Sequence, residues 1–433
     1  MDVPFGSPVP YAEPQWYTRN TSPYHNDSHR RLRAYVREYV DNHLAPNAQE
    51  WDQQGSVPVE AFKLFASKGF CVTKPTKEEY MGGVSLPAGI KPEEWDIFHS
   101  LIVSDELSRT GFGGALWGMN SGNSIGAPPI ANFGSHEQKL KYLPGIARGD
   151  IRFCLGITEP DAGSDVSRIK TVAKRVGDHY IVNGAKKWIT NAIWADYVTA
   201  AVRTGGPGHG GISLLIIPLA SKGVTRRRMY NSGVNASGST FIEFDDVQVP
   251  AENIIGIENQ GFKYIMSNFN PERLGLASGC IRLSRLCVED AFNYATTRET
   301  FGQPLINNQV IKAKFSKCGT LIESCQAFLD QLAYTIQLTE KTGRQIDIGG
   351  MTALLKVMST RCLEKVCREA QQILGGAGYN KSGKGARIES ISRDVRVYCV
   401  GGGSEEIMRD LAVREEMKHM RKVTAAQKQA AKL

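Results

Sequence analysis

The hydrophobic period changes twice along this chain of 433 residues, and no other feature constrains its fold as strongly. Across residues 27–153, apolar side chains recur at the three- and four-residue spacing of amphipathic helices. Across residues 154–258, they form short β-branched or aromatic runs separated by Gly, Asn and Asp. Helical spacing returns across residues 259–420. The sequence therefore predicts an α+β protein with an N-terminal all-α domain, a middle antiparallel β domain (a compact sheet or a small barrel) and a C-terminal four-helix bundle.

The two ends of the chain lie outside these three segments. Residues 1–26 have no hydrophobic period, so an irregular leader is expected. Residues 421–433 form a basic tail, and the segment from residue 417 onward supplies five of the net charge of +8. The body is thus mildly basic. It suits an anionic ligand, but it lacks the dense basic patch with interleaved aromatics that is typical of nucleic-acid-binding proteins.

Three residue patterns exclude other classes of protein. No apolar run approaches the ~18 residues of a membrane-spanning helix, and the first residues lack the apolar segment of a signal peptide. The nine cysteines form no C-x-x-C pair; Cys280 and Cys287, like Cys318 and Cys325, share a helix face, so reduced core residues are expected. The eight histidines have no metal-ligand spacing, so no metal site is expected.

Short elements are expected in the first two segments. A helix should begin near Asp27, and further predicted helices are Val59–Ser67, Glu93–Ser108 and His136–Leu143, with the Gly-rich stretch Gly111–Asn123 between helices. Predicted strands are Tyr180–Gly184, Tyr197–Val202, Ile212–Ile217 and Phe241–Phe244. Gly206–Gly211 matches the dinucleotide-binding pattern G-x-G-x-x-G, which requires a following helix. Because a strand follows instead, this stretch is expected to be a hairpin loop.

One stretch at the start of the middle segment fits neither helix nor strand. Leu155–Val166 contains Pro160 and Gly163, which interrupt both, and short polar side chains that bond to nearby backbone. Such a fixed loop presents N–H groups and hydroxyls to a planar polar ligand. It is followed by Lys187–Asn191, an aromatic residue beside a hydroxyl at the end of a predicted strand. Together the two stretches resemble the flavin-binding signature of the acyl-CoA dehydrogenase family, and the likeness extends over residues 27–420.

The resemblance implies FAD as the cofactor. Trp188 would stack on the flavin ring with Thr190 near its reactive nitrogen, whereas Arg298 would reach the pyrophosphate in a neighbouring subunit. The full set of expected FAD-binding residues is Leu155, Ile157, Thr158, Gly163, Ser164, Trp188, Ile189, Thr190, Arg298, Phe301, Asn308, Gln309, Gln372, Ile373, Gly375, Gly376, Ser404 and Glu406. The residues alone leave ordinary alternatives open. Trp188 could be a core residue, Thr190 the end of a strand and Arg298 a solvated side chain, and the turn with Gly375 and Gly376 could be a helix C-cap.

The resemblance also implies the chemistry, which is removal of a proton α to a thioester carbonyl while hydride leaves the β carbon. Many members carry the catalytic Glu in a turn before the last helix, where this sequence has Gly402. Long-chain and isovaleryl-type members carry it in an earlier helix, where this sequence has Glu272. Glu272 is therefore the expected base, and Gly402 is expected to donate its backbone N–H to the carbonyl oxygen. The alternative for Glu272 is a first-turn acid after Pro271, stabilised by the helix dipole.

The expected reaction forms trans-2-enoyl-CoA from a saturated acyl-CoA, in fatty-acid β-oxidation or branched-chain breakdown. Residues expected to contact the substrate are Ser164, Asn270, Arg273 and Gly402, with Trp117, Gly118 and Ser121 at the pocket floor. Two alternatives are an acyl-CoA oxidase, which passes electrons to oxygen, and a non-catalytic flavoprotein of the same fold used in assembly or DNA association. Family members are usually homotetramers, built as dimers of dimers. The electron acceptor, oxygen or another flavoprotein, is left open.

The last three residues, Ala431-Lys432-Leu433, follow the small–basic–Leu pattern of a peroxisomal address. The tail around them is basic and free of acids, and no mitochondrial-type leader is seen. Recognition by the peroxisomal import receptor is therefore expected, with a cytoplasmic location as the alternative.

Overall fold

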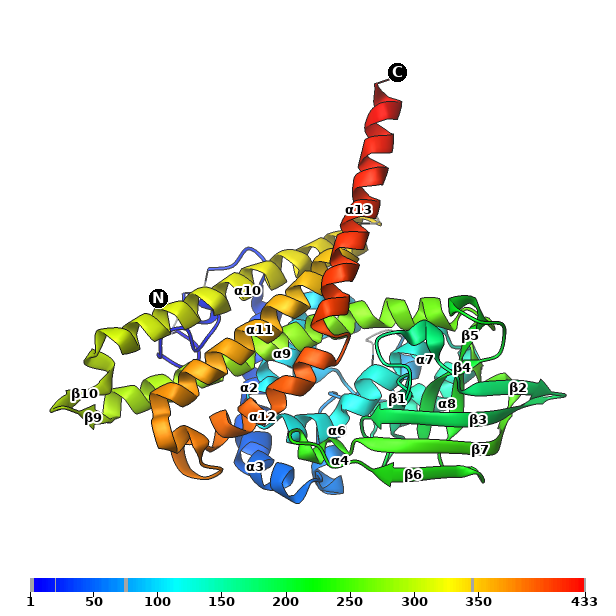
Figure 1. The fold of residues 1–433 in the computed structure, drawn as a ribbon, viewed down its shortest axis with the longest axis horizontal. Coiled ribbons are helices and arrows are strands. Elements are labelled where there is room, and N and C mark those ends of the chain that lie inside the picture. The colour runs from blue at the N-terminus through cyan, green and yellow to red at the C-terminus, as the bar shows by residue number, and fades with distance from the viewer. Residues whose placement is uncertain (1–3, 20, 74–76, 344–345, 432–433) are drawn as a thin grey trace. The chain divides into compact units, whose positions relative to one another are not determined.

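The computed structural model describes residues 4–19, 21–73, 77–343 and 346–431, which form two compact units (Figure 1). The first unit contains the described residues up to 33, residues 96–111 and the described residues from 270 onward. The second unit contains the described residues of 34–95 and 112–269. Both units combine segments that are far apart in the sequence.

The boundaries of the elements are as follows. The α-helices are α1 (Gln15–Thr18), α2 (Asp27–Tyr39), α3 (Ala45–Gln54), α4 (Val59–Ser67), α5 (Ile97–Ser108), α6 (Gly113–Gly126), α7 (Pro128–Phe133), α8 (His136–Ala147), α9 (Gly261–Thr297), α10 (Gln309–Thr342), α11 (Gly349–Leu374), α12 (Ala386–Val400) and α13 (Glu405–Ala430). The strands are β1 (Phe153–Gly156), β2 (Val172–Val176), β3 (His179–Ile189), β4 (Tyr197–Arg203), β5 (Ile212–Pro218), β6 (Val224–Arg228), β7 (Thr240–Pro250), β8 (Ile254–Ile255), β9 (Glu299–Thr300) and β10 (Gln303–Pro304).

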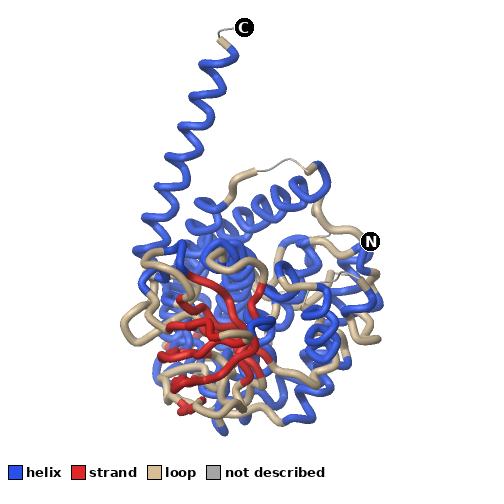
Figure 2. The backbone as a smooth tube through the Cα atoms, turned by 90° about the vertical axis from the view of Figure 1, so that its right-hand side faces the viewer, coloured by secondary structure: helices blue, strands red, loops and turns tan. Residues whose placement is uncertain are grey.

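Strands β1–β8 form one sheet in the second unit (Figure 2). Its order is β6-β7-β3-β2-β4-β5-β8, with β1 beside β4, and the pairs are antiparallel except β1–β4 and β2–β4. Along β5, Leu214 and Ile216 join one apolar cluster while Leu215 and Ile217 join another. Burial on both faces explains why β5 reads as an unbroken apolar run. The loop 206–211 joins β4 to β5 in an antiparallel hairpin, as predicted.

The Gly-rich stretch after residue 111 forms helix α6, which the sequence did not predict. A Cβ atom on Gly122 would lie 2.5 Å from the carbonyl oxygen of Phe153, and one on Gly126 would lie 2.6 Å from that of Cys154. Only glycine permits the helix to approach strand β1 this closely. Glycine is a poor helix former, so its role in packing hid the helix from a propensity argument.

The helix boundaries in the remaining N-terminal region depart only slightly from the predictions. Helix α4 spans the predicted Val59–Ser67. Helix α5 begins at Ile97 rather than Glu93, because the Asp96 side chain accepts a hydrogen bond from the N–H of His99 (3.1 Å) and caps the helix. Helix α8 extends beyond Leu143 to Ala147.

The predicted C-terminal bundle is present in the first unit as α9, α10, α11 and α13, and the structure adds α12. Helix α12 was missed because its packed face is partly polar. Arg387 donates to Asp290 of α9 (Nε to Oδ2, 2.8 Å), and Asp394 is 1% exposed. Paired charges can be buried without producing an apolar stripe in the sequence.

The described part of the leader is irregular apart from α1, yet Ala12–Pro14, Trp16 and Tyr17 are buried in the first unit. Glu13 and Arg282 of α9 form an ion pair (Oε2 to Nη1, 2.7 Å) in which both side chains are fully buried. Arg282 also donates to Asp105 (Nε to Oδ1, 3.1 Å), and the Tyr17 hydroxyl donates to Glu106 (2.6 Å). Such buried pairs contribute little net stability but are very sensitive to loss of one partner, so they fix the path of the leader.

The structure also bears on the cysteines and on membrane-spanning helices. All nine cysteines are buried and none forms a disulfide, as expected for reduced core residues. Within the described ranges, no helix combines the length and apolar character needed to cross a membrane.

Candidate functional site

A buried ion pair in the second unit fixes the loop that follows β1. Lys186 of β3 is fully buried and donates through Nζ to Glu159 Oε1 (2.8 Å) and to the carbonyl of Ile157 (3.1 Å). Glu159 also accepts hydrogen bonds from the N–H groups of Lys170 (2.5 Å) and Thr171 (2.9 Å). Burial lowers the pKa of Lys186 to about 8. Burial acts to raise the pKa of Glu159, but the Lys186 ammonium holds it below its usual value.

The same strand presents Trp188 outward from the sheet. The Trp188 side chain is 52% exposed, which excludes the core alternative, and its backbone has a φ of +65°. A positive φ is strained for a bulky residue. The β3–β7 register is irregular between Lys186 and Ile189, next to this position. Asn191, also at positive φ, anchors the segment by donating through Nδ2 to the carbonyls of Trp117 (3.0 Å) and Ser237 (2.9 Å).

These features fit a planar cofactor. An exposed aromatic face held in a strained conformation can stack on a ring, and strain of this kind often accompanies binding sites. Ser164 is exposed, and a Cβ atom on Gly163 would meet nothing within 4 Å, so the loop leaves room for a ligand. Thr158 is half-buried, and its carbonyl accepts a hydrogen bond from the N–H of Lys187 (2.9 Å). Thr190 directly follows the end of β3, so its position also fits the alternative that it is simply a strand end.

Several predicted ligand residues have side chains that face the protein interior. Ile157, Ile189 and Ile373 are 6%, 3% and 5% exposed, so they could contact FAD only through backbone groups or a side-chain edge. Leu155 is half-buried. Gly118, expected at the pocket floor, instead packs on Ala236, because a Cβ atom there would lie 2.3 Å from the Ala236 carbonyl oxygen. Trp117 and Ser121, on the same helix, are half-buried.

Glu272 lies within α9 of the first unit. The helix begins at Gly261 and contains Pro271 in its interior, so the interpretation of Glu272 as a first-turn acid is wrong. The Glu272 Oε2 atom is shielded from solvent and has no hydrogen-bond partner in the described part of the chain. Burial raises the pKa of Glu272 to about 7, although Arg273 and Lys356 act to lower it. A carboxylate with one shielded, unpartnered oxygen and a pKa near neutrality has the properties of a general base.

The turn between α12 and α13 is bonded to the helix that carries Glu272. Arg273 donates through Nε to the Gly402 carbonyl (3.0 Å) and through Nη1 to Asn270 Oδ1 (3.1 Å). Gly402 has a φ of +67°, where glycine is favoured. In the described structure its N–H donates to no protein group, so this N–H is available to a ligand. Asn270, Glu272, Arg273 and Gly402, chosen from the sequence, thus belong to one local arrangement.

A buried lysine that sequence reasoning missed completes this arrangement. Lys356 of α11 has no exposed surface, and its Nζ donates to the carbonyls of Cys399 and Gly403, each at 2.7 Å. In the sequence Lys356 resembles any lysine on an amphipathic helix. The only available signal was its position among small and apolar residues in Ala353–Ser359.

The remaining acids near the turn do not compete with Glu272. Glu405 pairs with Arg361 and with Arg409 (2.9 Å), and the hydrogen bond from Arg361 keeps the pKa of Glu405 below its usual value. Glu406 is exposed. Ser404 is the N-cap residue of α13, although its side chain makes no capping hydrogen bond.

The residues predicted to hold the distal part of FAD lie far along the helices from Glu272. Arg298 is exposed at the β9–β10 hairpin (Figure 1), and 26 residues at ~1.5 Å per residue place it ~39 Å along α9 from Glu272. Phe301 in this hairpin is fully exposed. Of the other predicted residues, those that are also exposed are Asn308, Gln309, Gln372, Gly375 and Gly376. No Cβ contact within 4 Å is found at Gly375 or Gly376, so a ligand could approach this backbone.

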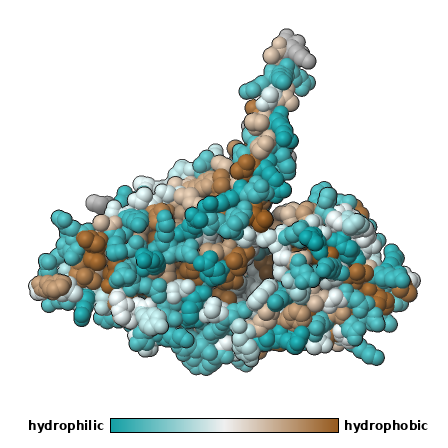
Figure 3. All heavy atoms as spheres, viewed as in Figure 1, coloured by the Kyte–Doolittle hydropathy of each residue, from teal (hydrophilic) through white to brown (hydrophobic). Residues whose placement is uncertain are grey.

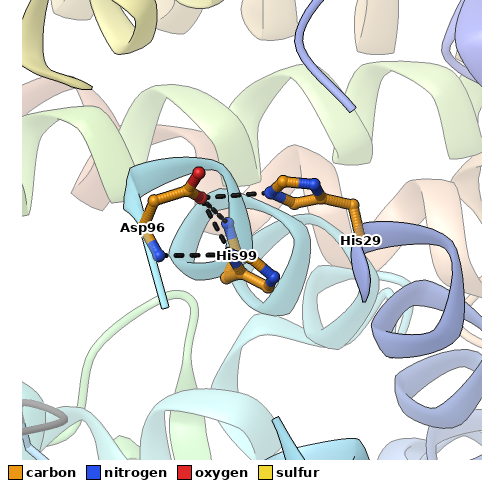
Figure 4. A group of neighbouring side chains, drawn as sticks. All are labelled: His29, Asp96 and His99. Atoms are coloured by element: carbon orange, nitrogen blue, oxygen red, sulfur yellow. Dashed lines mark hydrogen bonds and ion pairs between the residues drawn. The ribbon is translucent and has the colours of Figure 1, made fainter. Parts of the chain in front are cut away.

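The fold also assembles a cluster that the histidine spacing did not reveal (Figure 4). Asp96 Oδ1 lies 3.1 Å from His29 Nε2 and 2.8 Å from His99 Nδ1, and Gln337 donates to Asp96 Oδ2 (2.6 Å). Burial acts to raise the pKa of Asp96, but hydrogen bonds from both histidines hold it far below its usual value. The N–H of Asn26 donates to His29 Nδ1 (3.1 Å), so Nε2 carries the proton of the neutral ring and offers no lone pair to a metal. The cluster therefore links α2, α5 and α10 as a polar contact.

Comparison with known proteins identifies relatives of one family along most of the chain. The descriptions "Acyl-CoA dehydrogenase, N-terminal domain", "middle domain" and "C-terminal domain" match residues 26–150, 154–247 and 259–417. The chain is 46% identical to "Acyl-CoA dehydrogenase AFT10-1" of Alternaria alternata, over 97% of this chain and 98% of that protein. It is 30% identical to "Isovaleryl-CoA dehydrogenase, mitochondrial" of Pongo abelii, over 89% of this chain and 87% of that protein.

A solved structure supports this at the level of the fold. The crystal structure of a probable acyl-CoA dehydrogenase from Mycobacterium abscessus superposes with a TM-score of 0.80 at 34% identity, covering 90% of this chain and 98% of that one. The predicted α+β architecture is thereby confirmed. The chain belongs to the acyl-CoA dehydrogenase family, whose members are FAD-dependent oxidoreductases.

Proposed function

We propose that this enzyme converts a saturated acyl-CoA to the trans-2-enoyl-CoA, with Glu272 as the catalytic base. The observation that carries the proposal is the shielded, unpartnered Oε2 atom of Glu272, whose carboxyl pKa is raised to about 7. Glu272 accepts the proton from the α carbon of the thioester. Bound FAD would accept hydride from the β carbon. The N–H of Gly402 stabilises the negative charge that develops on the thioester oxygen, since this N–H has no acceptor in the described protein.

The cofactor assignment follows from the second unit. We propose that Trp188 packs on the flavin ring and that the Thr158–Ser164 loop, held by Lys186 and Glu159, supplies hydrogen bonds to it. Ser164, Asn270 and Arg273 are the proposed substrate contacts. The exposed Arg298 and Phe301 are proposed to serve the FAD of another subunit, because ~39 Å of helix separates Arg298 from Glu272.

We also propose that the enzyme assembles as a homotetramer, because helix α13 has exposed apolar side chains. Helix α13 carries apolar side chains on its outer surface, visible as brown spheres along it in Figure 3. Val413, Met417 and Met420, spaced as on one helix face, are 61%, 45% and 57% exposed. Contiguous exposed apolar groups of this kind commonly mark contacts between proteins.

A panel of acyl-CoA esters mixed with purified enzyme without oxygen tests the function. At least one saturated straight-chain or branched ester is expected to bleach the flavin absorbance and release the trans-2-enoyl-CoA. Admission of air then separates two activities: slow reoxidation indicates a dehydrogenase, and rapid reoxidation with stoichiometric peroxide indicates an oxidase. A protein that carries FAD but is bleached by no ester would contradict the proposal and favour the non-catalytic alternative.

We also propose that the enzyme is imported into peroxisomes, on the basis of the terminal Ala431-Lys432-Leu433. Lys432 and Leu433 lie outside the described residues. Deletion of Leu433 is expected to abolish import of a fluorescent fusion while activity in vitro is unchanged, because the receptor reads the free terminus. Deletion of Met1 and Asp2 at the other end is the matched control. Peroxisomal fluorescence of the Leu433-deleted chain would exclude the address.

A further inference from the structure

We propose that Lys356 is the positioning residue of the reaction: it fixes the glycine turn that stabilises the thioester oxygen and sets the proton affinity of Glu272. The inference rests on the proposed function and extends it to a residue that contacts neither substrate nor cofactor. Its basis is a fully buried ammonium bonded to the same turn that Arg273, the residue after Glu272, also holds.

The geometry shows how Lys356 would fix the turn. Its two hydrogen bonds reach Cys399, near the end of α12, and Gly403, two residues before α13 begins, so they hold the turn at both ends. Gly402 lies between these anchors, and Arg273 holds its carbonyl. Gly402 and Gly403 both have positive φ, a backbone shape without regular hydrogen bonds of its own. The direction of the Gly402 N–H therefore depends on the two cations.

The charges around Lys356 explain its effect on Glu272. The titratable and charged groups whose electrostatic influence reaches Lys356 are Cys280, Cys399, Arg273 and Glu405, and those that act on Glu272 are Arg273 and Lys356. Burial raises the pKa of both thiols, so they are neutral, and Glu405 is already paired with two arginines. No carboxylate forms an ion pair with Lys356 in the described structure. Its positive charge is thus available to favour the ionised form of Glu272.

A buried ammonium without a carboxylate partner is costly, which argues against a purely packing role. Burial favours the neutral amine over the charged ammonium, and it lowers the pKa of Lys356. A methionine or leucine of similar volume would fill the same space without that cost. Unlike an apolar side chain, the charged lysine can hold the two carbonyl groups of the turn and favour the ionised form of Glu272.

The test uses two neutral variants, Lys356→Met and Lys356→Gln, with Lys365→Met as the control because Lys365 is exposed on the same helix. Two quantities are measured in FAD-loaded enzyme: the rate of anaerobic flavin reduction against pH, and the infrared carboxylic-acid band that Glu272→Gln lacks. In both neutral variants we expect the midpoint of each titration to rise by about one pH unit, as for loss of a nearby opposite charge. The limiting rate at high pH should fall at least ~10-fold, since the oxyanion donor is misdirected.

The control and Lys356→Arg separate charge from packing. Lys365→Met should match the parent in both titrations, and Lys356→Arg should keep the parental midpoint even where its rate is lower. An unchanged midpoint in either folded neutral variant would overturn the proposal, and so would an equal shift in Lys365→Met. The infrared band reports the proton on Glu272 whether or not Glu272 is the base. Failure of the catalytic assignment would instead appear as parental flavin reduction by Glu272→Gln.

Discussion

Glu272→Gln should lose flavin reduction by about a hundredfold to ten-thousandfold, the usual contribution of a general base. Glutamine keeps the size of the side chain but cannot accept the α proton. Acyl-CoA should still bind, because Asn270, Arg273 and the Gly402 N–H are untouched. Stopped-flow absorbance without oxygen measures the rate, and titration with a non-reactive CoA thioester measures binding. Parental flavin reduction by this variant would exclude Glu272 as the base.

The pH dependence of the parent enzyme provides a second reading of the same residue. Because the pKa of Glu272 is raised to about 7, the rate of flavin reduction should increase through pH 7 and reach a plateau above about pH 8. The contribution of Glu272 to folding stability changes with pH in the opposite direction to the rate. A folded pKa above the ordinary 4.5 gives stability that is fully present below pH ~4.5 and is lost as the pH rises through 7. At pH 8, Glu272→Gln should therefore unfold at or above the parental temperature, which separates lost catalysis from lost folding.

Moving the carboxylate to the late turn should restore only part of the activity. Gly402 has a φ of +67°, and a Cβ atom there would lie 3.0 Å from Leu276 Cδ1. A side chain in this conformation costs ~1–2 kcal/mol. The double variant Glu272→Gln with Gly402→Glu is therefore expected to exceed Glu272→Gln in rate but to remain well below the parent. It should also accept a narrower range of acyl chains, as measured with the ester panel.

Lys186→Met is the second substitution with a large expected effect. It would leave Glu159 buried without its cation, and breaking one partner of a buried pair costs ~3–5 kcal/mol. Because Lys186 also holds the Ile157 carbonyl, the loss should fall on the loop that carries Thr158 and Ser164. We expect a purified variant that retains little FAD, with a clearly lowered unfolding temperature.

The control for this prediction is Lys174→Met on the neighbouring strand β2, where the side chain is exposed. It should retain the parental FAD content, scored as the ratio of flavin to protein absorbance. Full FAD occupancy in Lys186→Met would show that the buried pair is not needed for the loop. Glu159→Gln with Lys186→Met, which removes the unpaired charge, should regain part of the lost stability.

The sequence by itself determined the order of the architecture, and it predicted which loop binds the cofactor. The change from helical to strand period is a local property of side-chain spacing, so it needs no tertiary context. Pro160 fixes its own φ and lacks an N–H, and Gly163 disfavours helix and strand by its conformational freedom, so both interrupt regular structure wherever they occur. This local property is why the Thr158 loop could be recognised. The absence of a Glu at position 402 together with its presence at 272 was likewise visible in the chain alone.

Tertiary structure decided which ordinary-looking residues are buried beside the proposed site residues. Lys186 and Lys356 are buried, whereas Lys174 and Lys365 are exposed, and no local pattern separates the two kinds because burial depends on segments distant in sequence. The same reason applies to α6, because the segments on which its glycines pack, β1 among them, are distant in sequence. It also applies to Glu272: α9 continues through Pro271, the folded chain shields the Oε2 atom of this side chain, and burial raises its pKa to about 7.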